Sequence, residues 1–552
     1  MKRFITFSIF CLAATLVAQP TDGIGSIEIS VVDRYEAKVA KPFKLSSQPQ
    51  VRDTTVSKLP VSVHVKARFL NPETRVQPIP PVKIKRTRLK RLPSNDFYLH
   101  VGNYATVQTG FAFGSSRNPS LTWGLSGDHF STQGGLQGAG DMMTQYNQAL
   151  WSENDVKGQL TYVFGRSRLR VEGLGQWNRY AFYGQPLDST STETAAPGRW
   201  VQSYGGRMVY EAPRFSRYQM FRGFELKGHH WIDQGGRQVE DAASTMIDWK
   251  LPVEDLELEL PLSASWSRLS GTARDTMAEY WAVKFSPSIS DSLQQVHFRI
   301  GMNVIFTDGL SGVKPYLPPI VHIEFPLVKN VLNVFGGVDG YVDHDGMRGL
   351  IQTVPFMAEN QDYQVGQSSM VYAGLTGRIT SAMGYRFTVQ NVSHRNYAMV
   401  TRWDPLQDSG RLSVDYVAAQ WLQASGEITL ETGMGWELRG HGLLRLSQSS
   451  GDGEPLLYAP KSEFGAEALI NFQDKIRVDA GFKIVGERDA ATKDGAIVLP
   501  GFVDLNARVV YTYNKQLNAV AQFRNVLNQK TAWYPYYPIQ GFQANLGLIY
   551  KF

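Results

Sequence analysis

The sequence is poor in cysteine, in charge and in long apolar runs, and each shortage excludes a class of protein. Its single cysteine, Cys11, lies in an N-terminal apolar segment, so the rest of the chain has no thiol for disulfides or cysteine-based metal sites. Charged residues are only 19% of the chain and aromatic residues are 12%, which is unlike a disordered protein. After residue 18 no stretch approaches the roughly 20 apolar residues that a membrane-spanning helix needs. The net charge of +6 over 552 residues is too small and too evenly spread to indicate a nucleic-acid partner.

Residues 1–18 have the three parts of a secretory signal peptide. Lys2 and Arg3 form a basic start, Phe4 to Val17 form an apolar core, and the small Ala18 stands where cleavage would occur. A membrane anchor is the alternative, but the apolar core is shorter than a membrane span requires. We therefore predict that residues 1–18 direct export and are removed.

Residues 19–95 differ from the rest of the chain because they are rich in proline and poor in glycine. Dense prolines prevent regular ladder pairing and favour extended or polyproline II chain, so we predict an extended periplasmic arm with one or two strand pieces. A basic run near its end fits an acidic partner or lipid headgroups, and the simpler alternative is a solvated linker. The basic residues of this run are Lys83, Lys85, Arg86, Arg88, Lys90 and Arg91.

From residue 96 to residue 552, apolar and polar residues alternate with the period of two that β-strands have. The pattern is clearest in the segments 464–472, 476–485, 503–513 and 542–552, each of which has one apolar face. Together with 51 glycines and the many aromatic residues, this alternation predicts an all-β protein. Among the other segments that we predict to be separate strands are 383–393, 396–403, 411–422 and 425–436.

The connections between these segments are alternately short and long. They are short between residues 472 and 476 and between 513 and 517, and long between 485 and 502 and between 525 and 540. This alternation is typical of a transmembrane barrel, which has tight turns at one end and longer loops at the other. A soluble sandwich is the alternative, although strands of about ten to twelve residues would be long for it. We predict that residues 96–552 form a closed antiparallel transmembrane β-barrel with an even number of strands, about 18–22.

In such a barrel the polar side chains of each strand face the lumen. Mixed charges there can line a pore, or they can form a salt-bridged wall that closes it. Because an open lumen of this width would leak, we expect loops, inward side chains or the arm to fill it, and we expect residues 20–95 to occupy or underlie part of it. The candidate lumen residues are Glu467, Asp479, Lys483, Asp504 and Arg508.

Sequence motifs for catalysis are scarce. The ten histidines have no metal-ligand spacing, and neither a nucleophile elbow nor a phosphate-binding loop is present. His129 and Ser131 would share one face of a strand, but no acid can be assigned to them from the sequence. Asp339, Asp343 and Asp345 lack the further ligands of a calcium loop and fit a polar turn. We therefore expect no enzyme, no cofactor and no metal.

The C-terminal part of the chain resembles a known family. Residues 523–530, which read FRNVLNQK, are similar to the Asn-Leu-Phe-Asn-Lys turn near the end of TonB-dependent receptor barrels. Trp533, Pro535, Tyr537 and Pro538 resemble the aromatic and proline-containing loop that follows, and residues 541–552 resemble the final strand. The resemblance implies that the terminal aromatic residues Tyr550 and Phe552 are the signal that the barrel assembly machinery reads.

The N-terminal half resembles plugless, receptor-like barrels of Bacteroidota. The similar residues are Pro49, Asp53, Thr54, Leu92, Gly102, Asn103, Tyr104 and the stretch 124–134. The chain departs from TonB-dependent transporters because their plug is a folded domain larger than residues 20–95, and because no TonB box is evident. We expect a protein of the outer membrane, in contact with its lipid, which either binds or transports a substrate or serves as a structural partner of other outer-membrane or periplasmic proteins.

Overall fold

The computed structural model describes residues 95–552 except 116–117, 137–143, 145, 147, 186–195, 213–219, 234–237, 254–255, 272–276, 294, 309–312, 402–409, 434 and 493–494. The predicted signal peptide and, apart from Asn95, the predicted arm with its basic run lie outside the described residues. No helix of the described residues is long and apolar enough to cross a membrane.

One antiparallel sheet contains most of the described chain and closes on itself. Each strand pairs with the next along the sequence, and the last strand pairs with the first through Asp96–Lys551 and Val101–Leu546. The sheet has 26 strand segments, which amount to 22 barrel strands because four strands are each interrupted once. The prediction of a closed antiparallel barrel with an even number of strands is therefore confirmed.

The barrel strands have the following bounds. The first eight are β1 (Asp96–Gly102), β2 (Val107–Gly114), β3 (Leu121–Gln133), β4 (Leu150–Phe164), β5 (Ser167–Ala181), β6 (Gly198–Glu211), β7 (Phe221–Asp233) and β8 (Gln238–Val253). The four interrupted strands are β9 (Leu256–Glu259) with β10 (Leu262–Ser270), β11 (Ala278–Phe285) with β12 (Ser288–Leu293), β13 (Val296–Met302) with β14 (Val304–Thr307), and β15 (Lys314–Tyr316) with β16 (Pro319–Val328). The last ten are β17 (Leu332–Asp343), β18 (Gly366–Arg378), β19 (Met383–Val400), β20 (Val414–Thr432), β21 (Trp436–Ser450), β22 (Ser462–Phe472), β23 (Ile476–Val485), β26 (Phe502–Thr512), β27 (Leu517–Arg524) and β30 (Gln543–Lys551).

Prolines account for three of the four interruptions. Pro261, Pro287 and Pro318 stand at the breaks of their strands, where proline has no N–H to donate to the ladder. Their carbonyl oxygens still accept hydrogen bonds from the neighbouring strand, as Pro261 O does from Ser286 N at 3.0 Å. The wall therefore remains continuous across each break.

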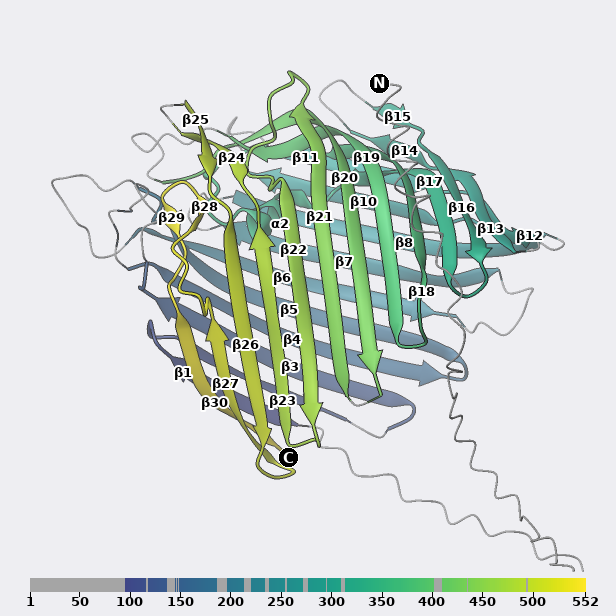
Figure 1. Cartoon of the computed structure of the whole chain (residues 1–552). Coiled ribbons are helices and arrows are strands. Elements are labelled where there is room, and N and C mark those ends of the chain that lie inside the picture. The colour runs from purple at the N-terminus through teal and green to yellow at the C-terminus, as the bar shows by residue number, and fades with distance from the viewer. Residues whose placement is uncertain are drawn as a thin grey trace, which may run out of the picture. The chain divides into compact units, whose positions relative to one another are not determined.

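The connections define two different ends of the barrel. The end that carries the short connections 165–166, 329–331, 473–475 and 513–516, and also the first and last residues of the barrel, is called the turn end here. The opposite end, called the loop end, carries most of the long connections, which contain α2 (Gly346–Thr353) and the hairpins of β24 (Arg488–Thr492) with β25 (Gly495–Leu499) and of β28 (Ala532–Tyr534) with β29 (Tyr537–Pro538). Figure 1 shows both hairpins at the opposite end of the wall from the C-terminus. In bacterial barrels the short turns face the periplasm and the long loops face outward.

The outer face of the wall is an apolar belt. On β1, Phe97, Leu99 and Val101 point outward and are exposed, whereas His100 between them is buried on the inner side. The same alternation exposes large apolar side chains around the wall, among them Leu125, Leu160, Val171, Phe482, Leu546 and Leu548. Exposure of so many large apolar side chains is stable only where lipid covers them.

Two of the predicted strand boundaries are wrong. Segments 383–393 and 396–403 belong to the one strand β19, and segments 411–422 and 425–436 belong largely to β20. β19 has a register shift at His394–Tyr397, which changes the face that its side chains occupy. In the sequence such a shift of phase looks like the end of a strand. The shift opposite Leu422–Gln423 has its extra residue, Leu446, on β21, so β20 itself keeps its phase. Helix α2 was also not predicted.

Candidate functional site: a charged lumen beneath a loop cap

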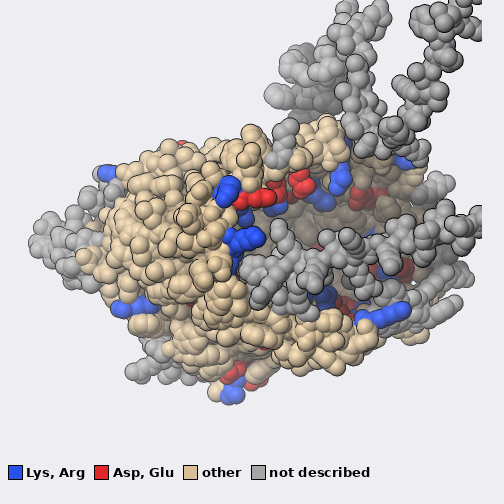
Figure 2. All heavy atoms as spheres, turned by 90° about the horizontal axis from the view of Figure 1, so that it is seen from below, with Lys and Arg blue, Asp and Glu red and all other residues tan. Residues whose placement is uncertain are grey.

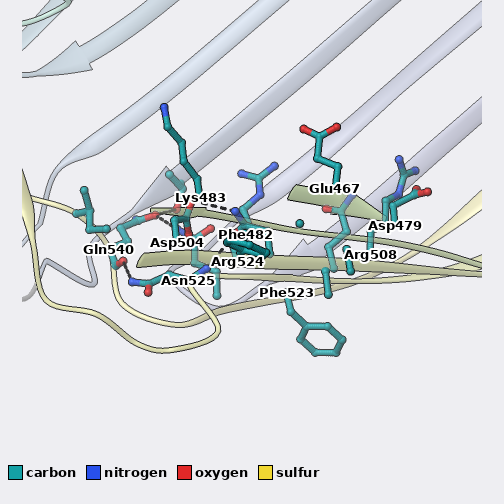
Figure 3. Close-up of a pocket in the computed structure, with 18 of the residues that line it drawn as sticks. Glu467, Asp479, Phe482, Lys483, Asp504, Arg508, Phe523, Arg524, Asn525 and Gln540 are labelled. Atoms are coloured by element: carbon teal, nitrogen blue, oxygen red, sulfur yellow. Dashed lines mark hydrogen bonds between the residues drawn. The ribbon is translucent and has the colours of Figure 1, made fainter. Parts of the chain in front are cut away.

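A cavity of about 980 Å³ lies against the inner wall, mainly on β21, β22, β23, β26 and β27. All five candidate lumen residues line it, and Figure 3 shows their positions. They sit at inward positions because each alternates with outward apolar residues, as Asp504 and Arg508 do with Val503 and Val509. The cavity also contains charged residues that we did not single out, namely Glu437, Arg439, Arg477 and Arg524. The same alternation of strand β21 would have found the first two.

The charges of this wall are of both signs and partly paired. Asp479 Oδ1 accepts a hydrogen bond from Arg477 Nε at 2.9 Å. Lys483 Nζ lies 2.7 Å from Glu463 Oε2. Asp504 Oδ2 accepts from the Asn506 amide at 2.9 Å.

Two other basic groups of the wall, Arg508 and Arg524, form no salt bridge among the described residues. Arg508 Nε is buried and has no hydrogen-bond partner among the described residues. The Arg524 guanidinium lies 5.4 Å from the ring centroid of Phe130 and also interacts electrostatically with the Glu153 carboxylate. The wall therefore presents charged side chains of both signs to the cavity.

Figure 2, which looks toward the turn end, shows a hollow whose wall carries many of the visible Lys, Arg, Asp and Glu side chains. The loop end is different, because loops pack there against the inner wall like a protein core. We call this assembly the loop cap. Its centre is the segment from α2 to Val365, together with Leu412 and Tyr537. The inward strand residues that pack against it include Tyr180, Val201, Trp231 and Leu269, and all of these residues are buried.

Aromatic rings hold the cap loops to each other. The ring centroids of Phe356 and Tyr537 are 4.0 Å apart in a stacked arrangement, and Tyr183 packs edge-on against Tyr537 at 4.8 Å. The Tyr537 hydroxyl donates a hydrogen bond to Gly410 O, which joins the connection between β19 and β20 to the same cluster. Burial raises the pKa of Tyr458 and that of Tyr534, both in these loops, to about 12.

Buried charged groups join the cap to the wall. Arg199 and Asp233 form an ion pair in which both side chains are 0% exposed, and Arg199 Nη1 donates to Met357 O at 2.7 Å. Glu240 of the inner wall accepts the N–H of Arg348 at 2.8 Å, which places its carboxylate at the N-terminus of α2. These contacts involve side chains that are far apart in the sequence, so the sequence alone offered no signal for them.

In the loop hairpins, the buried Arg488 also holds two separate segments of the chain together. Its Nη2 donates to Ala532 O at 3.0 Å, and its guanidinium lies about 5 Å from the ring centroids of Phe502 and Trp533. It therefore joins the β24–β25 hairpin to the aromatic loop that follows β27.

The predicted assembly signal lies at the end of β30. Tyr550 and Phe552 are exposed on the outer face, and their rings stack with centroids 5.7 Å apart. Their recognition by the assembly machinery stays a prediction. Among the described residues, no group of three or more His, Cys, Asp or Glu side chains is arranged to hold a metal ion.

No family model and no curated protein matches the sequence. Solved structures do match the fold. The FrpB iron transporter from Neisseria meningitidis has a TM-score of 0.64 at 11% identity and aligns over 84% of this chain and 83% of its own. The siderophore receptor PirA from Acinetobacter baumannii has a TM-score of 0.61 at 10% identity over 84% and 81%. The ferric enterobactin receptor PfeA from Pseudomonas aeruginosa has a TM-score of 0.61 at 11% identity over 83% and 80%.

At identities of 10–11%, these TM-scores show a likeness of fold alone. With the apolar belt and the closed 22-strand wall, they define an outer-membrane β-barrel that resembles TonB-dependent receptors.

Proposed function

We propose that the protein is a gated, receptor-like barrel of the outer membrane, in which a substrate reaches the charged lumen only when the loop cap opens. The observation that carries this proposal is the buried Arg199–Asp233 pair, which joins the wall to the backbone of Met357. A cap built on such contacts has one defined closed arrangement, unlike loops that move freely. Gating requires a second, open arrangement as well, in which these contacts are broken.

The lumen beneath the cap suits a ligand that carries charges of both signs. Its wall offers the pair Arg477–Asp479 and the partly unpaired Arg508 within one cavity. The solved structures with this fold include iron and siderophore receptors by their titles, and this supports a transport role without naming a substrate for this chain.

The proposal is tested by ion conductance in planar bilayers. The full chain is compared with a variant in which residues 346–357 are replaced by a Gly-Ser linker. Both are first shown to be folded barrels, because a folded barrel changes its migration in a denaturing gel when the sample is heated. We expect the full chain to conduct little and the variant to form large, stable channels. A full chain that already conducts like a porin would overturn the proposal, and so would a folded variant that remains closed.

A second candidate is a structural barrel that holds a partner protein from the periplasmic side. The hollow of Figure 2 favours this candidate, since its charged wall faces the turn end. Purification of the full chain from native membranes in mild detergent discriminates the two functions. A partner that co-purifies in a fixed ratio and is lost when Arg477 and Arg508 are reversed to glutamate would favour the structural barrel. A barrel that purifies alone would favour the gated receptor.

A further inference from the structure

Three polar side chains form a hydrogen-bonded chain on β3 and β4, near the loop end. Ser131 Oγ lies 3.1 Å from His129 Nε2, and His129 Nδ1 lies 2.6 Å from Asn154 Oδ1. His129 and Asn154 are direct partners in the register of the two strands. The sequence pattern found the first two residues but no acid, and the third member of the chain is an amide from the next strand.

The surroundings of Asn154 fix the proton on His129. The Asn154 amide nitrogen donates to Trp177 O at 2.6 Å, so its carbonyl oxygen is the atom that faces His129. A carbonyl can only accept, and therefore His129 Nδ1 carries the hydrogen and His129 Nε2 has a free lone pair toward Ser131. A serine, a histidine base and a group that orients the base are the arrangement of an activated nucleophile.

This chain of side chains faces outward, away from the lumen. Leu121, Trp123 and Leu125 lie at odd positions of β3 and are exposed on the apolar belt, and the pairing on both sides of β3 shows no register shift up to Ser131. The even positions Phe130 and Thr132 line the luminal cavity instead. His129 and Ser131 are therefore on the lipid side of the wall.

The site lies at the loop-end edge of the apolar belt. On β4 the outward residues from Phe164 to Val156 are apolar or glycine, and Asn154 is the next outward residue toward the loop end. A membrane-spanning strand needs about 9–11 residues, and residues 156–164 supply that length. Trp177 and Tyr204 lie outward on the neighbouring strands and share a hydrogen bond of 2.9 Å, as befits rings at a membrane interface.

We propose that Ser131, His129 and Asn154 form a hydrolytic site for a long-chain acyl ester of a membrane lipid in the outer leaflet. Ser131 Oγ bonds to the ester carbonyl carbon as His129 Nε2 takes the hydroxyl proton. Collapse of the tetrahedral oxyanion breaks the bond to the lipid alkoxide, which takes the proton from Nε2 and leaves as the alcohol. Water then attacks the acyl-serine, its proton passes through His129 back to Ser131 Oγ, and the fatty acid is released. Asn154 is a positioning residue, because it acts through His129.

Donors for the oxyanion must come from beyond the strand, since the N–H groups of β3 belong to ladders on both sides. Gly134 and Gly135 are the first residues after β3 and have φ of +85° and +70°. Neither N–H is hydrogen-bonded to another described residue. Among the described residues, the turn after β3 therefore has two unpaired backbone donors, three and four residues from the proposed nucleophile.

The full chain in detergent micelles is first treated with an alkyl fluorophosphonate, which bonds to an activated serine oxygen with loss of fluoride. Mass spectrometry identifies the labelled residue. We expect label on Ser131, and none in Ser131→Ala or in a sample unfolded by heat. The matched control is Ser126→Ala, which removes the same hydroxyl from the inward face of β3 and should leave labelling unchanged.

Release of fatty acid is then measured from two sources of the same ester chemistry, phospholipid in mixed micelles and purified lipopolysaccharide. We expect one source to be hydrolysed. In His129→Ala the rate of fatty-acid release should fall roughly 10²–10⁴-fold, which is the contribution typical of a general base. Asn154→Ala should also lose activity, and Asn154→Asp should restore it with a changed pH profile, a rescue that a merely structural amide would not give.

Absence of label on Ser131 in a folded barrel would overturn the proposal. Hydrolysis of neither lipid, or hydrolysis that survives in Ser131→Ala, would overturn it as well. None of these results bears on gating, because the site lies outside the lumen and the conductance of the full chain is measured separately.

Discussion

Inward-facing strand positions carry apolar side chains at one end of the lumen and charged side chains toward the other. At the loop end the inward side chains of Trp231 and Leu269 are buried against loops. Along the cavity wall that leads away from the cap, the inward side chains are charged, as in Arg477 and Asp479, and remain in contact with the hollow. The strands are equivalent in backbone structure, so the difference comes from whether another part of the chain packs on them.

Ion pairs at the two ends show what this difference means in energy. Arg199 and Asp233, on the wall beneath the cap, are both 0% exposed, whereas Arg168 and Glu211 near the turn end are 46% and 49% exposed. Removing one partner of a buried pair leaves an unpaired charge without water, while an exposed charge is simply hydrated. The cap should therefore be sensitive to single substitutions, and the turn end should tolerate them.

The largest effect is expected for Asp233→Ala. It leaves Arg199 buried without its carboxylate and should cost the closed cap about 3–5 kcal/mol. We expect faster hydrogen–deuterium exchange in residues 346–357 and channel openings in bilayers where the full chain has few.

Two controls accompany this substitution. Replacing both partners, as Arg199→Met with Asp233→Leu, removes the unpaired charge and should restore most of the protection. Glu211→Ala near the turn end should change stability by roughly 0–1 kcal/mol. Equal effects of Asp233→Ala and Glu211→Ala would contradict the contrast between the two ends.

A somewhat smaller effect is expected for Met357→Ala. Met357 is fully buried in the cap, and its truncation leaves a cavity that should cost about 2–5 kcal/mol. Met302 on the outer face provides a matched control, because lipid replaces the lost contacts there. The two variants are compared by heating each in detergent and measuring the temperature at which protease begins to cleave the cap. If Met302→Ala proved as damaging as Met357→Ala, the cap would not be a packed core.

The sequence predicted the wall better than it predicted the cap. Period-two alternation depends only on neighbours in the chain, so it identified the barrel, and it pointed to Asp479 and Arg508 as lumen residues that the structure places on one cavity. The cap depends on contacts between distant segments, such as Arg199 with Met357 and Tyr537 with Gly410. No local pattern marks such pairs.

The chain formed by Ser131, His129 and Asn154 was also only partly predictable, because it includes a contact between two strands. His129 and Ser131 are two residues apart on one strand, so the period-two pattern predicts that they share a face. Asn154 comes from the next strand, and only the register of β3 with β4 places it beside His129. The long aromatic connection between residues 525 and 540 was also noticed, but its packing against α2 was not visible without the fold. Resemblance to receptor barrels identified the fold from the C-terminal residues.

Substitutions of the luminal charges should change ion selectivity more than stability. In the variant that lacks the cap segment 346–357, Asp479→Asn with Asp504→Asn leaves the basic groups of the wall in excess. We expect the reversal potential in a salt gradient to shift toward anions, with a thermal midpoint close to that of the parent. The opposite pair, Lys483→Gln with Arg508→Gln, should shift it toward cations. A potential that does not respond to either pair would mean that ions do not pass along this wall.

The smallest effect concerns the pH above which the closed cap loses stability. Burial raises the pKa of Tyr458 and Tyr534 to about 12 in the folded cap, and an unfolded tyrosine ionises near pH 10. Because the folded-state pKa is the higher one, the neutral hydroxyls contribute their full stabilisation below about pH 10 and lose it as the pH rises toward 12. Channel openings of the full chain should therefore become more frequent over this range. Replacing both tyrosines with phenylalanine removes the ionisation and should move the onset to higher pH, while Tyr511→Phe on the outer face should not. An onset that stays in place in the double variant would show that these buried rings do not set the alkaline stability of the cap.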